Sequence, residues 1–213
     1  REKGLIGIDK NGRPLIHYLL INAKSAGFKT IYLVIGQNSQ AFKSYFTKNK
    51  YDDLDIKFAI QYHDKNRSKP SGTADALYQA VTQFPVLKSL NFCVCNSDNL
   101  YSTKALNSVR TTTFLNAFIS YDRNYLNFNS EKVNSFSILK LNKNGYLEDI
   151  LEKPTIKDYN FFKDKNGKIR VNMNLFKFNG SVFFEFLKNC PFDKLRDEKE
   201  LSLIHISEPT RRS

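Results

Sequence analysis

Ile31-Tyr32-Leu33-Val34-Ile35 is an unbroken apolar run that ends at Gly36. A strand with one face in solvent alternates apolar and polar residues, whereas a strand of a parallel sheet is covered on both faces and is apolar throughout. Glycine is depleted in strand interiors, so its position agrees with a strand end. This stretch therefore predicts a buried parallel strand over residues 30–35.

Helical patterns lie on both sides of this strand. Upstream, residues 14–26 open with Pro14, carry apolar side chains at helical spacing and stop before Gly27, which is typical of a helix. Further helices are predicted at 39–48 and 74–84, and further strands at 56–61 and 92–95. Strands that alternate with helices of about ten residues predict an α/β fold in which helices cover both faces of a mostly parallel sheet.

The pattern becomes looser after residue 103. The sequence predicts helices at 103–110 and 181–187 and strands at 115–121, 136–141, 146–151 and 171–178. Lys143-Asn144-Gly145 is a turn signal between two of these strands, and it predicts a small antiparallel hairpin attached to the sheet. With 213 residues in total, the chain fits a single domain, which we place at residues 1–201.

The net charge is strongly positive, with 33 Lys and Arg against 21 Asp and Glu, or +12 at pH 7. Such a charge invites a nucleic-acid interpretation, because basic surfaces bind phosphate backbones. Nucleic-acid interfaces, however, usually gather basic residues on one face, whereas the lysines here are scattered singly along the chain. We therefore expect no nucleic-acid partner, although a basic lining for a phosphorylated small molecule stays compatible with this composition.

Hydrophobic residues make up 41% of the chain, which is enough for a core. No apolar run approaches the ~18–20 residues of a membrane helix, and the first residues lack the layout of a signal peptide. Three cysteines, Cys93, Cys95 and Cys190, are too few for a disulfide scaffold, and the histidines lie apart from them, which argues against structural zinc. We expect buried free thiols, no membrane partner and a cytoplasmic location.

Three polar segments are candidates for a ligand site, because ligands of open α/β sheets bind beyond the carboxyl ends of the strands. Residues 70–76, PSGTADA, place Gly72 at a helix entrance, where backbone amides can approach a nucleotide. Asp98 follows the predicted strand 92–95, and a carboxylate there can bind Mg²⁺. Glu152-Lys153-Pro154 can hold hydroxyls and a phosphate. The ordinary alternatives are a helix cap, an Asx turn and solvated charges, respectively.

The order of these and other segments resembles the sugar nucleotidyltransferase family, also called the nucleoside-diphosphate-sugar pyrophosphorylases. The segments that carry the resemblance are Lys3-Gly4-Leu5-Ile6-Gly7-Ile8, Gly12-Arg13-Pro14-Leu15-Ile16, Ala26-Gly27-Phe28, Gly72-Thr73-Ala74-Asp75-Ala76, Asp98, Glu152-Lys153-Pro154 and Val171-Asn172-Met173-Asn174. They match, in order, the family's lysine before an apolar strand, its K/R-P-L-I and A-G segments, and its G-T-A-D-A, G-D-N/H, E-K-P and V-N-x-G motifs. The resemblance spans residues 3 to about 187.

The resemblance implies a Rossmann-like, three-layer α/β/α fold and an enzyme that joins a nucleoside triphosphate to a sugar 1-phosphate and releases pyrophosphate. It implies Lys3 and Asp98 as catalytic residues, with Asp98 as the ligand of a Mg²⁺ cofactor. Gly72 and Thr73 would bind the nucleotide. The sugar phosphate would be bound by Glu152, Lys153 and Asn172, and such enzymes work in nucleotide-sugar biosynthesis.

Several departures from the family pattern accompany the resemblance. The phosphate-binding G-x-G-x-R loop of the family would lie upstream of Arg1, and its second metal-binding aspartate would lie beyond the end of this chain. We therefore expect the chain as given to be inactive by itself. Ser97 replaces the usual glycine before Asp98. Residues 202–213 resemble translated sequencing-adapter read-through, so we predict an artefactual tail and exclude His205 as a catalytic candidate.

Two other functions stay open from the sequence. A cytidylyltransferase for phosphocholine or a similar alcohol phosphate shares the opening segment and the aspartate with this family. A non-catalytic sugar-nucleotide sensor could share the whole fold. A homo-oligomer is compatible with either function.

Overall fold

The computed structural model describes residues 3–64, 66–67, 70–192 and 199. These residues divide into two compact units, the first formed by the described residues of 1–117 and 176–201 and the second by residues 118–175. The predicted single domain over residues 1–201 stays a prediction. The predicted tail 202–213, with His205, lies outside the described residues.

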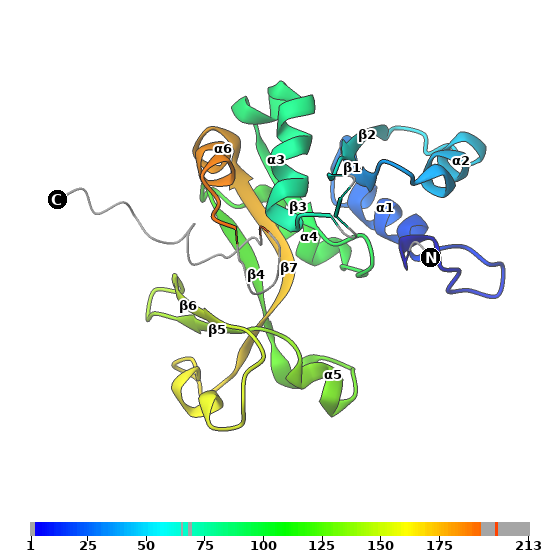
Figure 1. Cartoon of the computed structure of the whole chain (residues 1–213). Helices are drawn as coiled ribbons and strands as arrows, with labels where there is room; N and C mark the ends of the chain where they lie inside the picture. Colours follow the sequence, from blue (N-terminus) through cyan, green and yellow to red (C-terminus); the bar gives the residue numbers. More distant parts are fainter. Residues whose placement is uncertain (1–2, 65, 68–69, 193–198, 200–213) are drawn as a thin grey trace. The chain divides into compact units, whose positions relative to one another are not determined.

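Helices dominate the first unit (Figure 1). Its elements are η1 (Lys3–Leu5), α1 (Leu15–Ser25), β1 (Thr30–Gly36), α2 (Gln40–Lys48), β2 (Asp55–Gln61), α3 (Thr73–Gln83), η2 (Pro85–Ser89), β3 (Asn91–Cys95), α4 (Thr103–Thr111) and α6 (Gly180–Lys188). The second unit contains most of β4 (Ala117–Asp122), then η3 (Arg123–Tyr125), α5 (Ser130–Asn134), β5 (Ile138–Leu141), β6 (Leu147–Leu151) and η4 (Asp158–Phe161). Strand β7 (Arg170–Asn179) contributes to both units. Every helix and strand predicted from the sequence is present, with its ends within two residues of the prediction.

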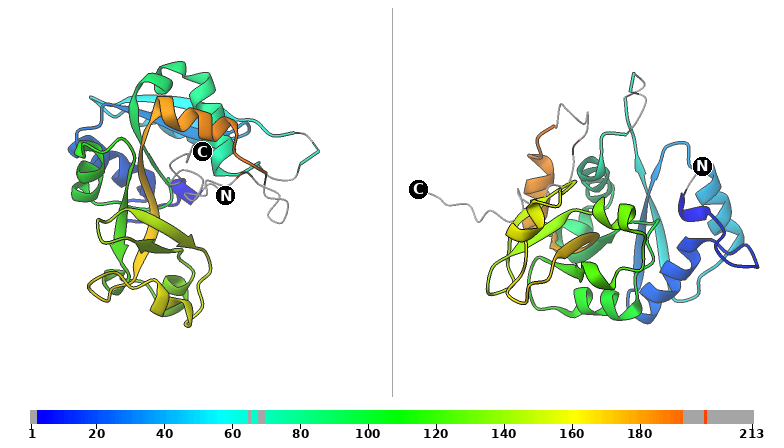
Figure 2. Two further views of the ribbon diagram at one scale, coloured as in Figure 1. Left: turned by 90° about the vertical axis from the view of Figure 1, so that its left-hand side faces the viewer. Right: turned by 90° about the horizontal axis from the view of Figure 1, so that it is seen from below.

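The first predicted strand is confirmed as β1, and β2 is its parallel partner. The two strands run in step from the pair Thr30 and Asp55 to the pair Gly36 and Gln61, and Figure 2 shows them side by side. Leu33 and Ile35 of β1 are buried. This pairing is the parallel arrangement that the unbroken apolar run predicts.

The expected single, mostly parallel central sheet is confirmed only in part. Strands β1 and β2 form a sheet of two, and the other strands form a sheet of five in the order β3-β7-β5-β6, with β4 also paired to β7. Strand β5 is antiparallel to both β6 and β7, so the predicted hairpin is present. Apolar patterns identify strands, but pairing depends on contacts between residues that lie far apart in the sequence. The prediction of one parallel sheet went beyond what those local patterns establish.

Two glutamines of α3 cover the free edge of β2. The Gln83 side-chain amide accepts from the backbone N–H of Ile60 and donates to its C=O, at 2.9 and 2.7 Å. Gln79 does the same for Tyr62, with 2.8 Å for both bonds. Each side-chain amide therefore takes the place of a peptide group on a neighbouring strand. These bonds fix the second half of α3 and the end of β2 relative to each other.

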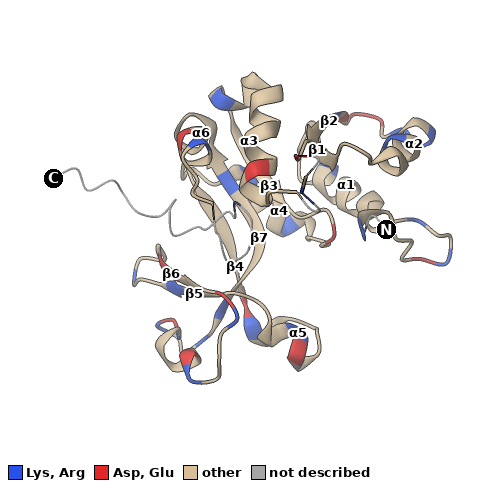
Figure 3. Ribbon diagram, in the orientation of Figure 1, with Lys and Arg blue, Asp and Glu red and all other residues tan. Residues whose placement is uncertain are grey.

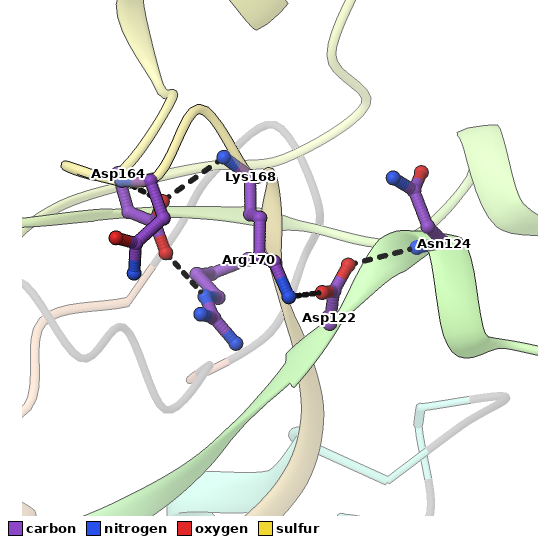
Figure 4. A network of polar contacts seen from close by, with 6 residues as sticks. Asp122, Asn124, Asp164, Lys168 and Arg170 are labelled. Atoms are coloured by element: carbon purple, nitrogen blue, oxygen red, sulfur yellow. Dashed lines mark hydrogen bonds and ion pairs between the residues drawn. The ribbon is translucent and has the colours of Figure 1, made fainter.

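Two ion pairs hold the second unit together around β7 (Figure 4). Lys168 lies 2.8 Å from the carboxylate of Asp122, and Arg170 lies 2.7 Å from that of Asp164. Asp164 also accepts the backbone N–H of Lys168, and the side chains of the two aspartates are only 9% and 12% exposed. The first pair joins the loop before β7 to Asp122 at the end of β4, and the second joins that loop to the first residue of β7, so together they set where this strand begins.

We expect acid to weaken the second unit through these pairs. The hydrogen bond from Lys168 holds the pKa of Asp122 below its ordinary value, and at Asp164 the bonds from Lys168 and Arg170 outweigh burial and also lower the pKa. A lowered pKa adds stability above the pKa of the unfolded chain, about 3.9, and this stability is lost as the pH falls through the folded value. Urea unfolding between about pH 6 and 2.5 should show this decline, and Asp122→Asn should flatten it. Glu148→Gln, which breaks the exposed pair with Lys140, serves as the control and should keep the decline.

Candidate functional site

Asp98 lies in the loop that follows β3, and Lys3 lies next to it. The Nζ atom of Lys3 is 3.8 Å from Oδ2 of Asp98, and the two side chains are 77% and 38% exposed. The two residues come from opposite ends of the first hundred positions of the chain. An ammonium and a carboxylate that both face solvent can act on a charged ligand at this point.

Gly4 explains how the segment with Lys3 comes so close to this loop. Gly4 is buried, and a Cβ atom on it would lie 3.2 Å from the carbonyl oxygen of Ser97 and 3.3 Å from the ring of Phe42. Only a residue without a side chain fits this approach without displacing its neighbours. In this segment Lys3 therefore supplies a charge, and Gly4 meets a packing requirement.

Gly72 is the residue before the first turn of α3, and its φ angle is +98°. Backbone conformations with a φ angle in this positive range favour glycine. Thr73 is the first residue of the helix, where backbone N–H groups lack partners within the helix. The predicted helix entrance is confirmed, whereas nucleotide binding by Gly72 and Thr73 stays a prediction.

Gln61 at the end of β2 is a polar residue of this region that the sequence analysis did not single out. Its side-chain amide donates to the carbonyl oxygen of Gly72 at 3.1 Å and to the carboxylate of Asp75 at 3.0 Å. Asp75 accepts a further bond of 2.9 Å from Gln79. In the sequence, Gln61 is the last residue of the predicted strand 56–61. A polar side chain at the carboxyl end of a parallel strand is the signal that could have indicated its place near a ligand site.

The candidate sugar-phosphate residues lie in the second unit, at one level of its sheet. Leu151 of β6 and Val171 of β7 both pair with Ile138 of β5. Glu152 and Asn172 each follow one of these paired residues, and the N–H of Asn172 donates to Ser137 of the next row. Since neighbouring strands lie ~4.8 Å apart, the backbones at Glu152 and Asn172 are about 10 Å apart. Lys153 follows with a φ angle of +50°, a conformation that a lysine adopts rarely.

Asn174 departs from the family's V-N-x-G pattern, and its backbone shows why the departure is tolerated. Its φ angle is +56°, a region where glycine is the ordinary residue and asparagine is the best tolerated alternative. The Asn174 backbone N–H donates to Oδ1 of Asn172 at 2.9 Å, and Nδ2 of Asn172 donates to Oδ1 of Asn174, also at 2.9 Å. The amide of Asn172, a predicted sugar ligand, is thus held by Asn174.

The chain matches known proteins over most of its length. The family model described as Nucleotidyl transferase matches residues 2–205. The chain belongs to the nucleotidyl transferase family. This match confirms the resemblance to the sugar nucleotidyltransferase family, and its range includes the segments from Lys3-Gly4 to Val171-Asn172.

Curated relatives of this nucleotidyl transferase include the "Bifunctional protein GlmU" of two Staphylococcus epidermidis strains, RP62A and ATCC 12228. Each is 25% identical over 190 residues, which cover 88% of this chain. The chain spans 37% of the length of these relatives. The likeness therefore concerns a part of each relative.

The structure brings together some of the predicted site residues of this nucleotidyl transferase. Lys3 and Asp98 form one contact in the first unit, and Gly72 and Thr73 lie in the same unit beside Gln61. Glu152, Lys153 and Asn172 belong to the second unit. The roles assigned to these residues in binding and catalysis stay predictions.

The donor set at Asp98 fits a magnesium ion that a substrate helps to hold. Among the residues that the structure describes, no group of three or more His, Cys, Asp or Glu side chains could hold a metal ion. Mg²⁺ is commonly bound by one or two carboxylates together with substrate phosphates and water. The partly exposed carboxylate of Asp98 meets this requirement, whereas the three or four protein ligands of a zinc site are not assembled in this part of the chain.

The structure also shows how the charged residues and the cysteines are distributed in the fold. Figure 3 shows basic and acidic residues interspersed along the ribbon of each unit. Cys93, Cys95 and Cys190 are free thiols, but the prediction that they are buried is wrong, because Cys93 and Cys190 are half-buried and Cys95 is exposed. Partial burial raises the pKa of Cys93 to about 11. Within the described ranges, no helix has the length and apolar character needed to cross a bilayer.

The positive φ angle of Asn174 leads to a prediction about stability. Alanine in this conformation costs about 1–2 kcal/mol, whereas glycine adopts it without strain and loses about 0.5–1 kcal/mol of chain entropy. Both substitutions also remove the side-chain bond to Asn172. Asn174→Ala should therefore be less stable than Asn174→Gly by about 1 kcal/mol in urea unfolding. Equal stability of the two variants would show that the strain does not exist.

Proposed function

We propose that this nucleotidyl transferase joins a nucleoside triphosphate to a sugar 1-phosphate and releases pyrophosphate. The contact between Lys3 and Asp98 at the carboxyl end of β3 is the observation that carries the proposal. Lys3 supplies a cation and Asp98 a potential metal ligand beyond the end of a strand, and ligands of α/β sheets bind beyond the carboxyl ends of strands. The ordered family segments and the match over residues 2–205 support the same reaction class.

The reaction needs alignment and charge neutralisation more than a general base. An oxygen of the sugar phosphate is already anionic, and it attacks the α-phosphorus of the triphosphate. A new bond forms between this oxygen and the α-phosphorus. The bond from the α-phosphorus to the oxygen that bridges it to the β-phosphorus breaks. Pyrophosphate leaves with the electron pair. No proton has to be removed from the nucleophile.

Lys3 and Asp98 supply the electrostatic part of this reaction. Lys3 neutralises charge on the departing pyrophosphate, and Asp98 is the residue that would hold Mg²⁺. When bound, the ion supplies further neutralisation of the phosphate oxygens. Fixed charges of this kind stabilise a transition state strongly because they need no reorganisation during the reaction.

The remaining residues bind the two substrates in this proposal. Gly72 and Thr73 admit the nucleotide to the start of α3, where Gln61 adds an amide. Glu152 holds sugar hydroxyls, and Lys153 and Asn172 hold the sugar phosphate. Free thiols agree with a cytoplasmic enzyme of nucleotide-sugar biosynthesis.

Pyrophosphate release by the full-length protein tests the proposal. The four common nucleoside triphosphates should be combined with several sugar 1-phosphates and Mg²⁺, and one pair should give turnover above the background of either substrate alone. Turnover only with CTP and phosphocholine would replace the proposal by an alcohol-phosphate cytidylyltransferase. Binding of a nucleotide sugar without any turnover would replace it by a sensor.

A further inference from the structure

Tyr101 is a buried side chain that ends next to the loop of Asp98. Only 3% of Tyr101 is exposed, and it lies between β3 and α4, one residue before Ser102, whose side chain caps α4 by accepting from the N–H of Ala105. A phenol is costly to bury unless its hydroxyl is hydrogen-bonded. The partners of this hydroxyl therefore show why a tyrosine is buried here.

The hydroxyl of Tyr101 is bonded to the loop on both sides of Asp98. It accepts from the backbone N–H of Asn96 at 3.4 Å and from the side-chain amide of Asn99 at 3.1 Å. Asp98 lies between these two anchors. A single oxygen atom thus ties down the start and the end of the segment that carries the carboxylate.

The backbone of Tyr101 is itself fixed to the body of the first unit. Its carbonyl oxygen accepts from the side-chain amide of Asn22 on α1 at 2.9 Å. The loop meets a second rigid surface at Ser97, which lies against buried Gly4. The loop is therefore held by Tyr101 at two points and by the glycine at a third, whereas the side chain of Asp98 remains partly in solvent.

We propose that Tyr101 is the positioning residue of Asp98: its hydroxyl holds the loop so that the carboxylate meets Lys3 and a Mg²⁺ ion shared with the triphosphate. This inference rests on the proposed function for the role of Asp98, but the anchoring of the loop does not depend on that function. Partners that orient a metal ligand commonly contribute a factor of 10–100 to metal affinity or activity. The hydroxyl, rather than the ring, supplies this effect.

Tyr101→Phe tests the proposal because it removes the hydroxyl and keeps the buried ring. We expect about a tenfold higher Mg²⁺ concentration for half-maximal pyrophosphate release and a 10- to 100-fold lower kcat/KM for the triphosphate. Hydrogen exchange of the Asn96 amide, measured by NMR, should become faster. Asn99→Ala, which removes one of the two bonds, should change the same quantities in the same direction by a smaller factor.

Tyr51→Phe is the matched control. The Tyr51 hydroxyl also has two partners in the first unit, Tyr45 and His17, each at 2.9 Å, so this variant loses similar bonds at residues that have no part in the proposed reaction. We expect its melting temperature to fall about as much as that of Tyr101→Phe, with wild-type Mg²⁺ dependence and unchanged exchange at Asn96.

The outcomes separate this inference from the proposed function. Wild-type Mg²⁺ dependence and unchanged Asn96 exchange in Tyr101→Phe would overturn the inference and leave the function standing. A wild-type protein without turnover on any substrate pair would overturn the function. In that case unchanged exchange at Asn96 would still refute the anchoring of the loop by Tyr101, and faster exchange would support it.

Discussion

Replacing Asp98 by asparagine should lower pyrophosphate release by about 10²–10³-fold in the full-length protein, because one charge-stabilising group of a transition state typically contributes this much. Asparagine keeps the size of the side chain but removes the negative charge that would bind Mg²⁺. The carboxylate is partly exposed and its ammonium partner lies at 3.8 Å, so its loss should affect folding little. Steady-state assays at saturating substrates should show the decrease in kcat.

Asp53→Asn is the control for this prediction. Asp53 pairs with Lys24 at 3.1 Å and is 71% exposed, so the variant removes the same charge from another lysine–aspartate pair of the first unit. Its φ angle of +65° suits asparagine. We expect wild-type turnover for this variant. Similar kcat values for both variants would refute the catalytic role of Asp98.

Gly180→Ala should destabilise the protein by about 3 kcal/mol, at the upper end of the ~1–3 kcal/mol that overpacking usually costs. A Cβ atom at Gly180 would overlap the carbonyl oxygen of Leu87 and lie 2.8 Å from that of Leu90. The Gly180 N–H also donates to Leu90 at 2.9 Å, so α6 cannot move away without losing this bond. For a chain of this size the melting temperature should fall by about 6–12 °C.

Gly36→Ala is the control for this prediction. It separates the steric contact at Gly180 from the general effect of replacing a glycine. A Cβ atom at Gly36 would meet only Oγ of Ser39, at an ordinary 3.5 Å. Where the backbone suits alanine, this substitution stabilises by about 0.4–1 kcal/mol through the unfolded chain. Melting curves of the two variants should therefore shift in opposite directions. Equal shifts would mean that α6 does not pack against η2 as closely as described.

The elements of the fold could be predicted because their signals are local. The apolar run Ile31–Ile35, the proline and glycine around α1 and the Lys143-Asn144-Gly145 turn each act within a few residues. Pairing is different, since the partner of β3 is β7, more than seventy positions further along the chain. No local pattern in the sequence of β3 predicts that β7 is its partner. The sheet of five was for this reason not foreseen.

The candidate site likewise combines residues that local sequence patterns indicate with residues whose role depends on contacts in the folded chain. Asp98 and Lys3 could be proposed from ordered segments, and the structure brings their side chains to 3.8 Å. Tyr101 could not be recognised, because a tyrosine two positions after Asn99 is an ordinary residue in the sequence, whereas Gln61 carried only the general signal of a polar side chain at a strand end. Only the folded chain shows that the hydroxyl and the amide are bonded to the segments on which the site depends.

The glutamines Gln79 and Gln83 also affect how copies of the protein can associate. The unpaired edge of a strand is a template on which a second molecule can add its own strand, and such growth leads to aggregates. The peptide groups of Ile60 on β2 and of Tyr62 directly after it are already engaged by side-chain amides. A second copy would have to break these bonds before it could extend the sheet there. Self-assembly of this enzyme should accordingly proceed through other surfaces.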